Sequence, residues 1–171
     1  KEKGVYDLVE VMPEVIARFP QAEFLFAGNK EVEQLKRMIE DRQLAQHAKV
    51  LGWVDGKEKL ELLRTSRILL LPSYTEGVPN VLLEAMASGL PAITCPVGGI
   101  PSVFIEGENG YFVSPGNTKD LAARIMHLLA NDEVCDDISD RTGQRASALY
   151  SIEVIGCELE KLYKEFLHIS C

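Results

Sequence analysis

Short apolar runs alternate with amphipathic segments along most of the chain. The apolar runs end at glycine, proline or polar turns and predict buried strands at 22–27, 49–54, 67–71, 92–95 and 110–113. Between and after them, apolar residues recur at helical spacing, which predicts helices at 5–19, 31–44, 57–64, 79–88, 119–129, 132–148 and 152–167. Strands that alternate with helices at short spacing form βαβ units. The sequence therefore predicts a doubly wound, Rossmann-like α/β domain with a parallel sheet covered on both faces.

The beginning of this pattern is unusual because the first predicted helix has no strand before it. Each later helix up to Ser88 follows a predicted strand, and a doubly wound domain normally opens with one. We therefore expect a sheet that lacks its first strand and leaves unpaired backbone groups along an edge. The first residue is Lys1 rather than Met, so we also expect a fragment of a longer protein. Pro13 should kink or restart the first helix, because it removes a helical hydrogen bond.

Composition narrows the class of protein. The chain has 171 residues, 46% of them hydrophobic, which is enough for a single well-buried domain spanning 1–171. Its net charge is −8 and no basic stripe interrupts the acidic balance, which argues against a nucleic-acid partner. We expect no metal site, because the cysteines form no C-x-x-C pair and no histidine has the spacing of a metal ligand. We also expect four reduced thiols in a cytoplasmic protein, because a disulfide framework is improbable in a chain of this length. The cysteines are Cys95, Cys135, Cys157 and Cys171.

The segment 69–91 contains the strongest candidate site. An apolar run is followed by a polar turn with Glu76, and a helix containing Glu84 begins near Pro79. The backbone N–H groups of residues 80–82 should lack partners inside this helix and so favour an anion. An anion flanked by two carboxylates that bind hydroxyl groups suits a phosphate-linked sugar. Taken alone, two glutamates at this spacing are common in a chain with 26 acidic residues.

The same segment resembles the signature of the family-four (group 1) retaining glycosyltransferases. That signature is E-G-x-x-x-x-x-x-E-A followed by x-A-x-G-x-P, and here it begins at Glu76-Gly77 and continues from Glu84-Ala85 to Pro91. The resemblance covers nearly the whole chain. It implies the C-terminal, donor-binding half of a two-domain GT-B enzyme, with a helix at 152–167 that crosses to an N-terminal domain. Because the acceptor site would lie on that domain, the isolated half should be inactive.

The resemblance also implies the reaction and its partners. A hexosyltransferase-type enzyme of this kind transfers a sugar from a nucleotide-activated donor to a glycan or lipid-linked acceptor, with retention of configuration and without a cofactor or metal. The sequence of the segment 76–87 is typical of enzymes of bacterial polysaccharide biosynthesis. We expect a cytoplasmic enzyme, with peripheral association at the inner face of the membrane as a further expectation.

Individual residues take roles from the same resemblance. Glu76 is the expected catalytic residue, which binds hydroxyls of the transferred sugar, and Glu84 should accept hydrogen bonds from the ribose hydroxyls. Lys3 matches the lysine of a K-G pair that binds the diphosphate, whereas the arginine of that clamp would precede Lys1. A side chain at Gly77 would crowd the donor. The remaining expected donor-binding residues are Gly28, Gly52, Val54, Val78, Pro79, Asn80 and Val81.

Several readings stay open on the sequence alone. The loop Gly28-Asn29-Lys30 departs from the family's G-x-G, so its contact with the donor is undecided. Trp53 suits the core and the nucleobase pocket equally. A nucleotide-sugar epimerase would share the pocket, and a non-catalytic module would bind the sugar nucleotide without transfer. The helix 152–167 has an apolar stripe that would serve either this sheet or another domain. The base, the sugar and the acceptor are not specified.

Overall fold

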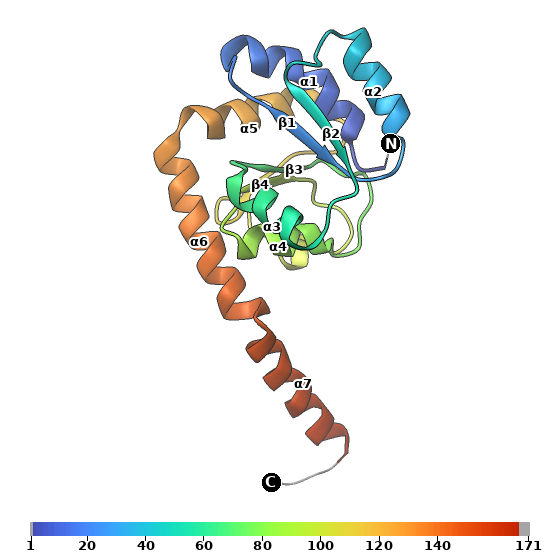
Figure 1. Ribbon diagram of the computed structural model, residues 1–171. Coiled ribbons are helices and arrows are strands. Elements are labelled where there is room, and N and C mark those ends of the chain that lie inside the picture. The colour runs from blue at the N-terminus through green and yellow to red at the C-terminus, as the bar shows by residue number, and fades with distance from the viewer. Residues whose placement is uncertain (1, 168–171) are drawn as a thin grey trace.

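The computed structural model describes residues 2–167 (Figure 1). Its strands are β1 (Phe24–Ala27), β2 (Ala48–Gly52), β3 (Leu69–Leu71), β4 (Ala92–Thr94) and β5 (Gly110–Phe112). Its helices are α1 (Val5–Arg18), α2 (Val32–Asp41), α3 (Gly56–Thr65), α4 (Asn80–Ala87), α5 (Thr118–Ala130), α6 (Asp132–Tyr150) and α7 (Ile152–Phe166), with a short 3₁₀ helix, η1 (Ile100–Ser102). Every strand and helix predicted from the sequence is present, with bounds that differ by a few residues.

The helix α1 does not restart at Pro13, so that version of the prediction was wrong. Pro13 lies on the exposed side of α1, where its ring does not disturb the core. The opposite side packs in the interior, and this packing stabilises the helix around the missing backbone donor. The buried residues of α1 are Leu8, Val9, Val11, Met12 and Val15.

The strands form two parallel sheets rather than one. β1 pairs with β2, and β3, β4 and β5 pair in that order. Among residues 2–167, no strand pair joins β1 to β3. The strands of a complete doubly wound sheet have the order 3-2-1-4-5-6. In that numbering, β1 and β2 correspond to strands 2 and 3, and β3, β4 and β5 correspond to strands 4, 5 and 6. The break therefore falls where the first strand would lie, in agreement with the sequence prediction.

The residues before α1 lie against the carboxyl end of β3. The Tyr74 N–H donates to the carbonyl oxygen of Glu2 at 2.8 Å. Gly4 has a φ of 66°, and a Cβ there would overlap the carbonyl group of Pro72. Only glycine combines this left-handed conformation with so close an approach. These contacts place Lys3 beside the loop that follows β3.

Helices cover both faces of the strands (Figure 1). On the face of α1, α2 and α5, a single hydrophobic core includes Phe26 of β1 and Ile93 of β4, so it joins the two sheets although no strand pair does. On the opposite face, α4 packs against β3 and β4. The buried cluster there includes Leu82, Met86, Ala92, Ile100 and Phe104.

The two C-terminal helices differ in how they contact the rest of the chain. α6 packs against α4 and α5, whereas α7 extends away from the body (Figure 1). None of the described residues of α7 is buried, so the interpretation that this helix covers the sheet was wrong. Its exposed apolar stripe consists of Ile155, Leu159, Leu162, Tyr163 and Phe166. No helix within residues 2–167 is long and apolar enough to cross a membrane.

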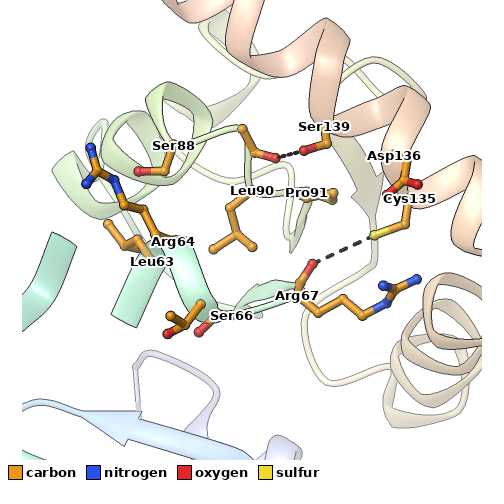
Figure 2. A pocket seen from close by; sticks show the side chains of 12 residues that line it. Leu63, Arg64, Ser66, Arg67, Ser88, Leu90, Pro91, Cys135, Asp136 and Ser139 are labelled. Atoms are coloured by element: carbon orange, nitrogen blue, oxygen red, sulfur yellow. Dashed lines mark hydrogen bonds between the residues drawn. The ribbon is translucent and has the colours of Figure 1, made fainter. Parts of the chain in front are cut away.

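A cavity of about 290 Å³ separates α6 from the end of α3 and the turn before β4 (Figure 2). The polar groups beside it bond to one another. The Ser139 hydroxyl donates to the Gly89 carbonyl oxygen, and the Cys135 thiol donates to the Arg67 carbonyl oxygen at 3.8 Å. The cavity lies at the amino ends of β3 and β4, whereas ligands of open α/β sheets bind at the carboxyl ends. It is therefore a packing junction of α6, and the candidate site lies at the opposite edge.

Candidate functional site

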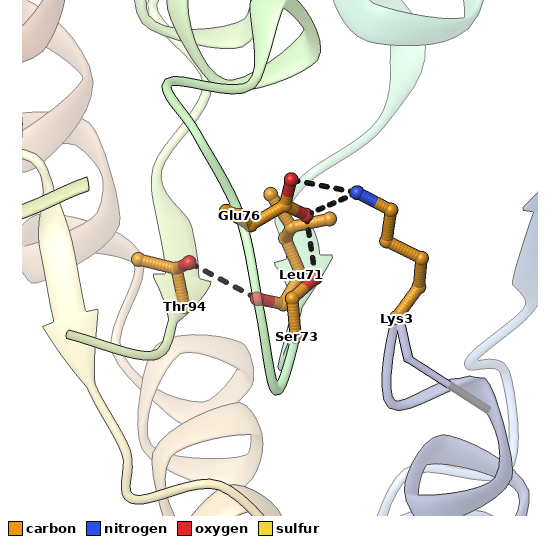
Figure 3. A network of polar contacts seen from close by, with 5 residues as sticks. All are labelled: Lys3, Leu71, Ser73, Glu76 and Thr94. Carbon is orange, nitrogen blue, oxygen red and sulfur yellow. Dashed lines mark hydrogen bonds and ion pairs between the residues drawn. The ribbon is translucent and has the colours of Figure 1, made fainter. Parts of the chain in front are cut away.

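Glu76 lies in the loop between β3 and α4, with only 5% of its side chain exposed. Lys3 Nζ donates to both of its carboxylate oxygens at 2.6 Å, and Ser73 Oγ donates to Oε1 at 2.7 Å (Figure 3). Ser73 itself is fully buried, and its N–H donates to the Leu71 carbonyl oxygen at 2.9 Å. A buried carboxylate needs such partners, since desolvation without them would be costly. The contacts fix the direction of the Glu76 carboxylate.

The backbone beside Glu76 is held by the loop that follows β4. Gly98 has a φ of 55°, and a Cβ there would overlap the carbonyl oxygen of Glu76. The next residue, Gly99, donates its N–H to the Gly77 carbonyl oxygen at 2.9 Å. The Gly98-Gly99 pair therefore permits two loops to pack backbone against backbone. By contrast, the space where a Gly77 side chain would stand is open.

The beginning of α4 faces the same edge. Pro79 is the N-cap residue, and no side chain caps the helix. The N–H of Leu82 donates to the Pro79 carbonyl oxygen at 3.0 Å, so the expectation that residues 80–82 all have free donors was wrong for Leu82. This bond closes a tight turn at the start of the helix, as is common at helix termini. The uncapped N–H groups that remain for an anion are those of Asn80 and Val81.

Glu84 lies along α4 and contacts the first turns of α3. Lys59 Nζ donates to Glu84 Oε1 at 2.7 Å, and the two side chains are 35% and 36% exposed. A cavity of about 290 Å³ lies between the two helices. Besides Lys59 and Glu84, its walls include Gly56, Leu60, Leu63 and Ala87. Sequence reasoning missed Lys59, because nothing local indicates that its side chain reaches α4.

The expected nucleobase turn lies at the carboxyl ends of β1 and β2. The Gly28 N–H donates to the Gly52 carbonyl oxygen at 2.7 Å, so these two positions meet. Trp53 is 68% exposed and its indole N–H donates to Asp55 at 3.3 Å, which excludes the core interpretation. Val54 is half-buried beside it. Gly28 and Gly52 therefore lie together at the carboxyl ends of β1 and β2.

A tyrosine links this edge to the start of α1. Tyr74 donates its hydroxyl to Asp7 at 2.9 Å, and this hydrogen bond raises the pKa of Tyr74 above its usual value. Elsewhere, burial raises the pKa of the Cys95 thiol to about 11, so it stays protonated at neutral pH and is a poor nucleophile. Within residues 2–167, no cluster of histidine, cysteine and carboxylate side chains could bind a metal. Cys171 lies outside the described residues.

Together, these features define a class of protein. Parallel strands with helices on both faces are the architecture of the C-terminal domain of a GT-B glycosyltransferase. The family model of the group 1 glycosyl transferases matches residues 1–145, and the chain belongs to this family.

Three similar proteins show how much of a relative the chain represents. It is 26% identical to the capsular polysaccharide biosynthesis glycosyltransferase CapM of Staphylococcus aureus, over 98% of this chain and 44% of the relative. Sucrose-phosphate synthase from Thermosynechococcus elongatus superposes with a TM-score of 0.85 at 28% identity, over 99% of this chain and 43% of that structure. HepE from Anabaena, solved in complex with UDP, has a TM-score of 0.86 at 22% identity, over 96% and 46%. The chain thus spans less than half the length of these proteins.

Proposed function

We propose that this chain is the donor-binding half of a retaining glycosyltransferase that uses a nucleoside-diphosphate sugar. The observation that carries the proposal is the buried Glu76 carboxylate, oriented by Lys3 and Ser73 beside the uncapped start of α4. The family membership and the UDP bound by HepE, a protein of the same fold, support it. The acceptor is a glycan or a lipid-linked sugar, by analogy with the capsular polysaccharide enzyme.

In this proposal, the two carboxylates and the start of α4 bind different parts of the donor. Glu76 accepts hydrogen bonds from hydroxyls of the transferred sugar, and Glu84 accepts them from the ribose. The N–H groups of Asn80 and Val81 and the ammonium of Lys3 contact the diphosphate. Lys3 has three donors, so it can bond to Glu76 and to a phosphate oxygen together. Negative charge grows on the diphosphate as it leaves, and these fixed positive groups lower the barrier.

Retention needs no nucleophile from this chain. The acceptor hydroxyl oxygen attacks the anomeric carbon from the side that the diphosphate leaves. The carbon–oxygen bond to the diphosphate breaks as the new glycosidic bond forms, and the hydroxyl proton passes to a diphosphate oxygen. No metal is required, since Lys3 and the helix start supply the positive charge.

A second domain binds the acceptor, and the exposed apolar stripe of α7 contacts that domain. The enzyme works on the cytoplasmic side, at the inner face of a membrane when its acceptor is lipid-linked.

Titration and product analysis test the proposal. UDP and GDP are titrated calorimetrically into the 171-residue chain at concentrations up to the millimolar range. Binding of either one supports the site, whereas binding of neither contradicts it. For the full-length protein, the anomeric configuration of the product is determined by NMR. Release of free UDP with an epimerised sugar would assign the epimerase class instead, and nucleotide binding without any product would indicate a non-catalytic module.

A further inference from the structure

Lys59 is a charged group at the candidate site to which the proposed function gives no role. It lies on the side of α3 that faces α4, and its ammonium group donates a hydrogen bond to Glu84 Oε1 at 2.7 Å. We infer that Lys59 is a positioning residue, which orients the Glu84 carboxylate so that it distinguishes a ribose from a deoxyribose. This inference rests on the proposed function, because it assigns the ribose to Glu84.

The geometry of the pair leaves room for a diol. A carboxylate has about four lone-pair directions on its two oxygens. Lys59 uses one of them on Oε1, and among the described residues Oε2 has no protein partner. Two adjacent hydroxyls can therefore donate to Glu84 while Lys59 remains bonded. A deoxyribose lacks one of these hydroxyls, so it loses the second bond.

Stability alone does not account for this pair. Both side chains are more than a third exposed, and a pair this exposed contributes little to the free energy of unfolding. A glutamate without a partner on a half-exposed helix face would sample several rotamers, and a ligand would have to order it. Lys59 supplies that order before the nucleotide arrives, so less conformational entropy is lost on binding.

Lys59 also connects two parts of the expected nucleotide site. The helix α3 begins directly after the turn that contains Trp53 and Val54, and the Lys59 N–H donates to the Asp55 carbonyl oxygen at 3.2 Å. Glu84 belongs to α4, which packs on the other sheet. No strand pair joins the two sheets within residues 2–167. The Lys59–Glu84 pair is therefore a direct contact between the part of the site with the nucleobase turn and the part with the ribose carboxylate.

The test compares UDP with 2′-deoxy-UDP by calorimetric titration into the full 171-residue chain. Lys59→Met removes the ammonium and keeps much of the stem. We expect it to weaken UDP binding by roughly three- to tenfold, the effect of one lost net hydrogen bond, and to leave 2′-deoxy-UDP nearly unchanged. Lys59→Arg retains a charged donor and should preserve most of the preference for UDP. Thermal melting of each variant verifies folding.

Lys57→Met is the matched control, because Lys57 lies exposed on the same helix and the same charge is removed. It should leave the ratio of the two affinities unchanged. If Lys59→Met weakened the binding of UDP and of 2′-deoxy-UDP equally, the inference would be overturned. Lys59 would then contribute only a general attraction to the diphosphate. Tighter UDP binding would also overturn it, because Lys59 would then compete with the ribose.

The same titrations separate this inference from the proposed function. If wild type prefers UDP, Glu84→Gln abolishes the preference and Lys59→Met leaves it intact, then the nucleotide site stands and the role of Lys59 is wrong. If wild type binds neither UDP nor GDP, the proposed function fails and the role of Lys59 fails with it.

Discussion

Glu76 and Glu84 lie in one loop–helix segment, yet the fold holds their carboxylates in different ways. Glu76 is nearly buried, both of its oxygens are bonded, and the backbone of another loop presses against its own carbonyl group. Glu84 is about one third exposed and bonds through one oxygen to one flexible side chain. The surroundings of Glu76 are thus built from backbone and buried groups, whereas Glu84 is held by a single side-chain contact.

This difference matches what the two proposed roles require. A group that stabilises a transition state is most effective when it does not reorganise during the reaction, so rigid surroundings favour turnover. A group that binds the ribose acts equally in the ground state and the transition state, so it affects affinity more than rate. We therefore expect substitutions near Glu76 to change turnover and stability, and substitutions near Glu84 to change nucleotide affinity.

The largest expected effect is that of Glu76→Ala on turnover. In the full-length enzyme, this substitution removes a charged hydrogen-bonding group that acts in the transition state. The activation free energy should rise by about 2–4 kcal/mol, which lowers the rate roughly 30- to 900-fold. The dissociation constant of UDP should change much less, because UDP contains no sugar hydroxyls of the transferred group. Steady-state kinetics and calorimetry on the same preparation measure both quantities.

Glu84→Gln is the control for this comparison and should show the opposite pattern. An amide replaces one acceptor oxygen by a donor, so UDP binding should weaken more than turnover at saturating donor. If Glu76→Ala weakened UDP binding and turnover equally, Glu76 would be a general support of the loop. The contrast between the two carboxylates would then disappear.

The next largest effect concerns the backbone contact beside Glu76. Gly98→Ala adds a Cβ that overlaps the Glu76 carbonyl oxygen and also strains a positive φ. Gly56→Ala is a matched control, since Gly56 has a φ of 51° and open space around its Cβ position. The control should lower the free energy of unfolding by about 1–2 kcal/mol, whereas Gly98→Ala should lower it by about 2–4 kcal/mol. Urea denaturation measures the difference, and equal losses would show that the contact between the loops is unimportant.

A smaller effect is expected at Ser73, which bonds to Glu76 from the buried side. Ser73→Ala removes one hydroxyl donor and leaves Lys3 in place. The activation free energy of transfer should therefore rise by about 1–2 kcal/mol, with little change in UDP affinity. Thr75→Ala is a suitable control, because Thr75 is exposed in the same loop. Unchanged turnover in Ser73→Ala would mean that Lys3 and the backbone alone orient Glu76.

Much of this fold could be predicted because its signals are local. The alternation of apolar runs and amphipathic segments located the five strands and seven α-helices of residues 2–167, and the absence of a run before the first helix indicated a missing first strand. The division into two sheets was not predicted, because strand order depends on which strands meet in space. Glu76 and Glu84 could be found from the spacing of a short segment. Their partners could not, because Lys59 reaches Glu84 and Gly98 reaches Glu76 across the fold. A single sequence records residue types along the chain, but not which side chains meet in space.

The smallest expected effect is that of Glu84→Gln on stability. The Lys59–Glu84 pair is more than a third exposed on both sides, so solvent screens it and offers each group an alternative partner. We expect the free energy of unfolding to fall by at most about 0.5 kcal/mol, and less in high salt. Glu76→Gln should lower it more, since Lys3 and the buried Ser73 hydroxyl would lose a charged acceptor. Parallel urea denaturation of the two variants measures the ranking. A larger loss for Glu84→Gln would show that this pair clamps α3 to α4, and its role would then be structural.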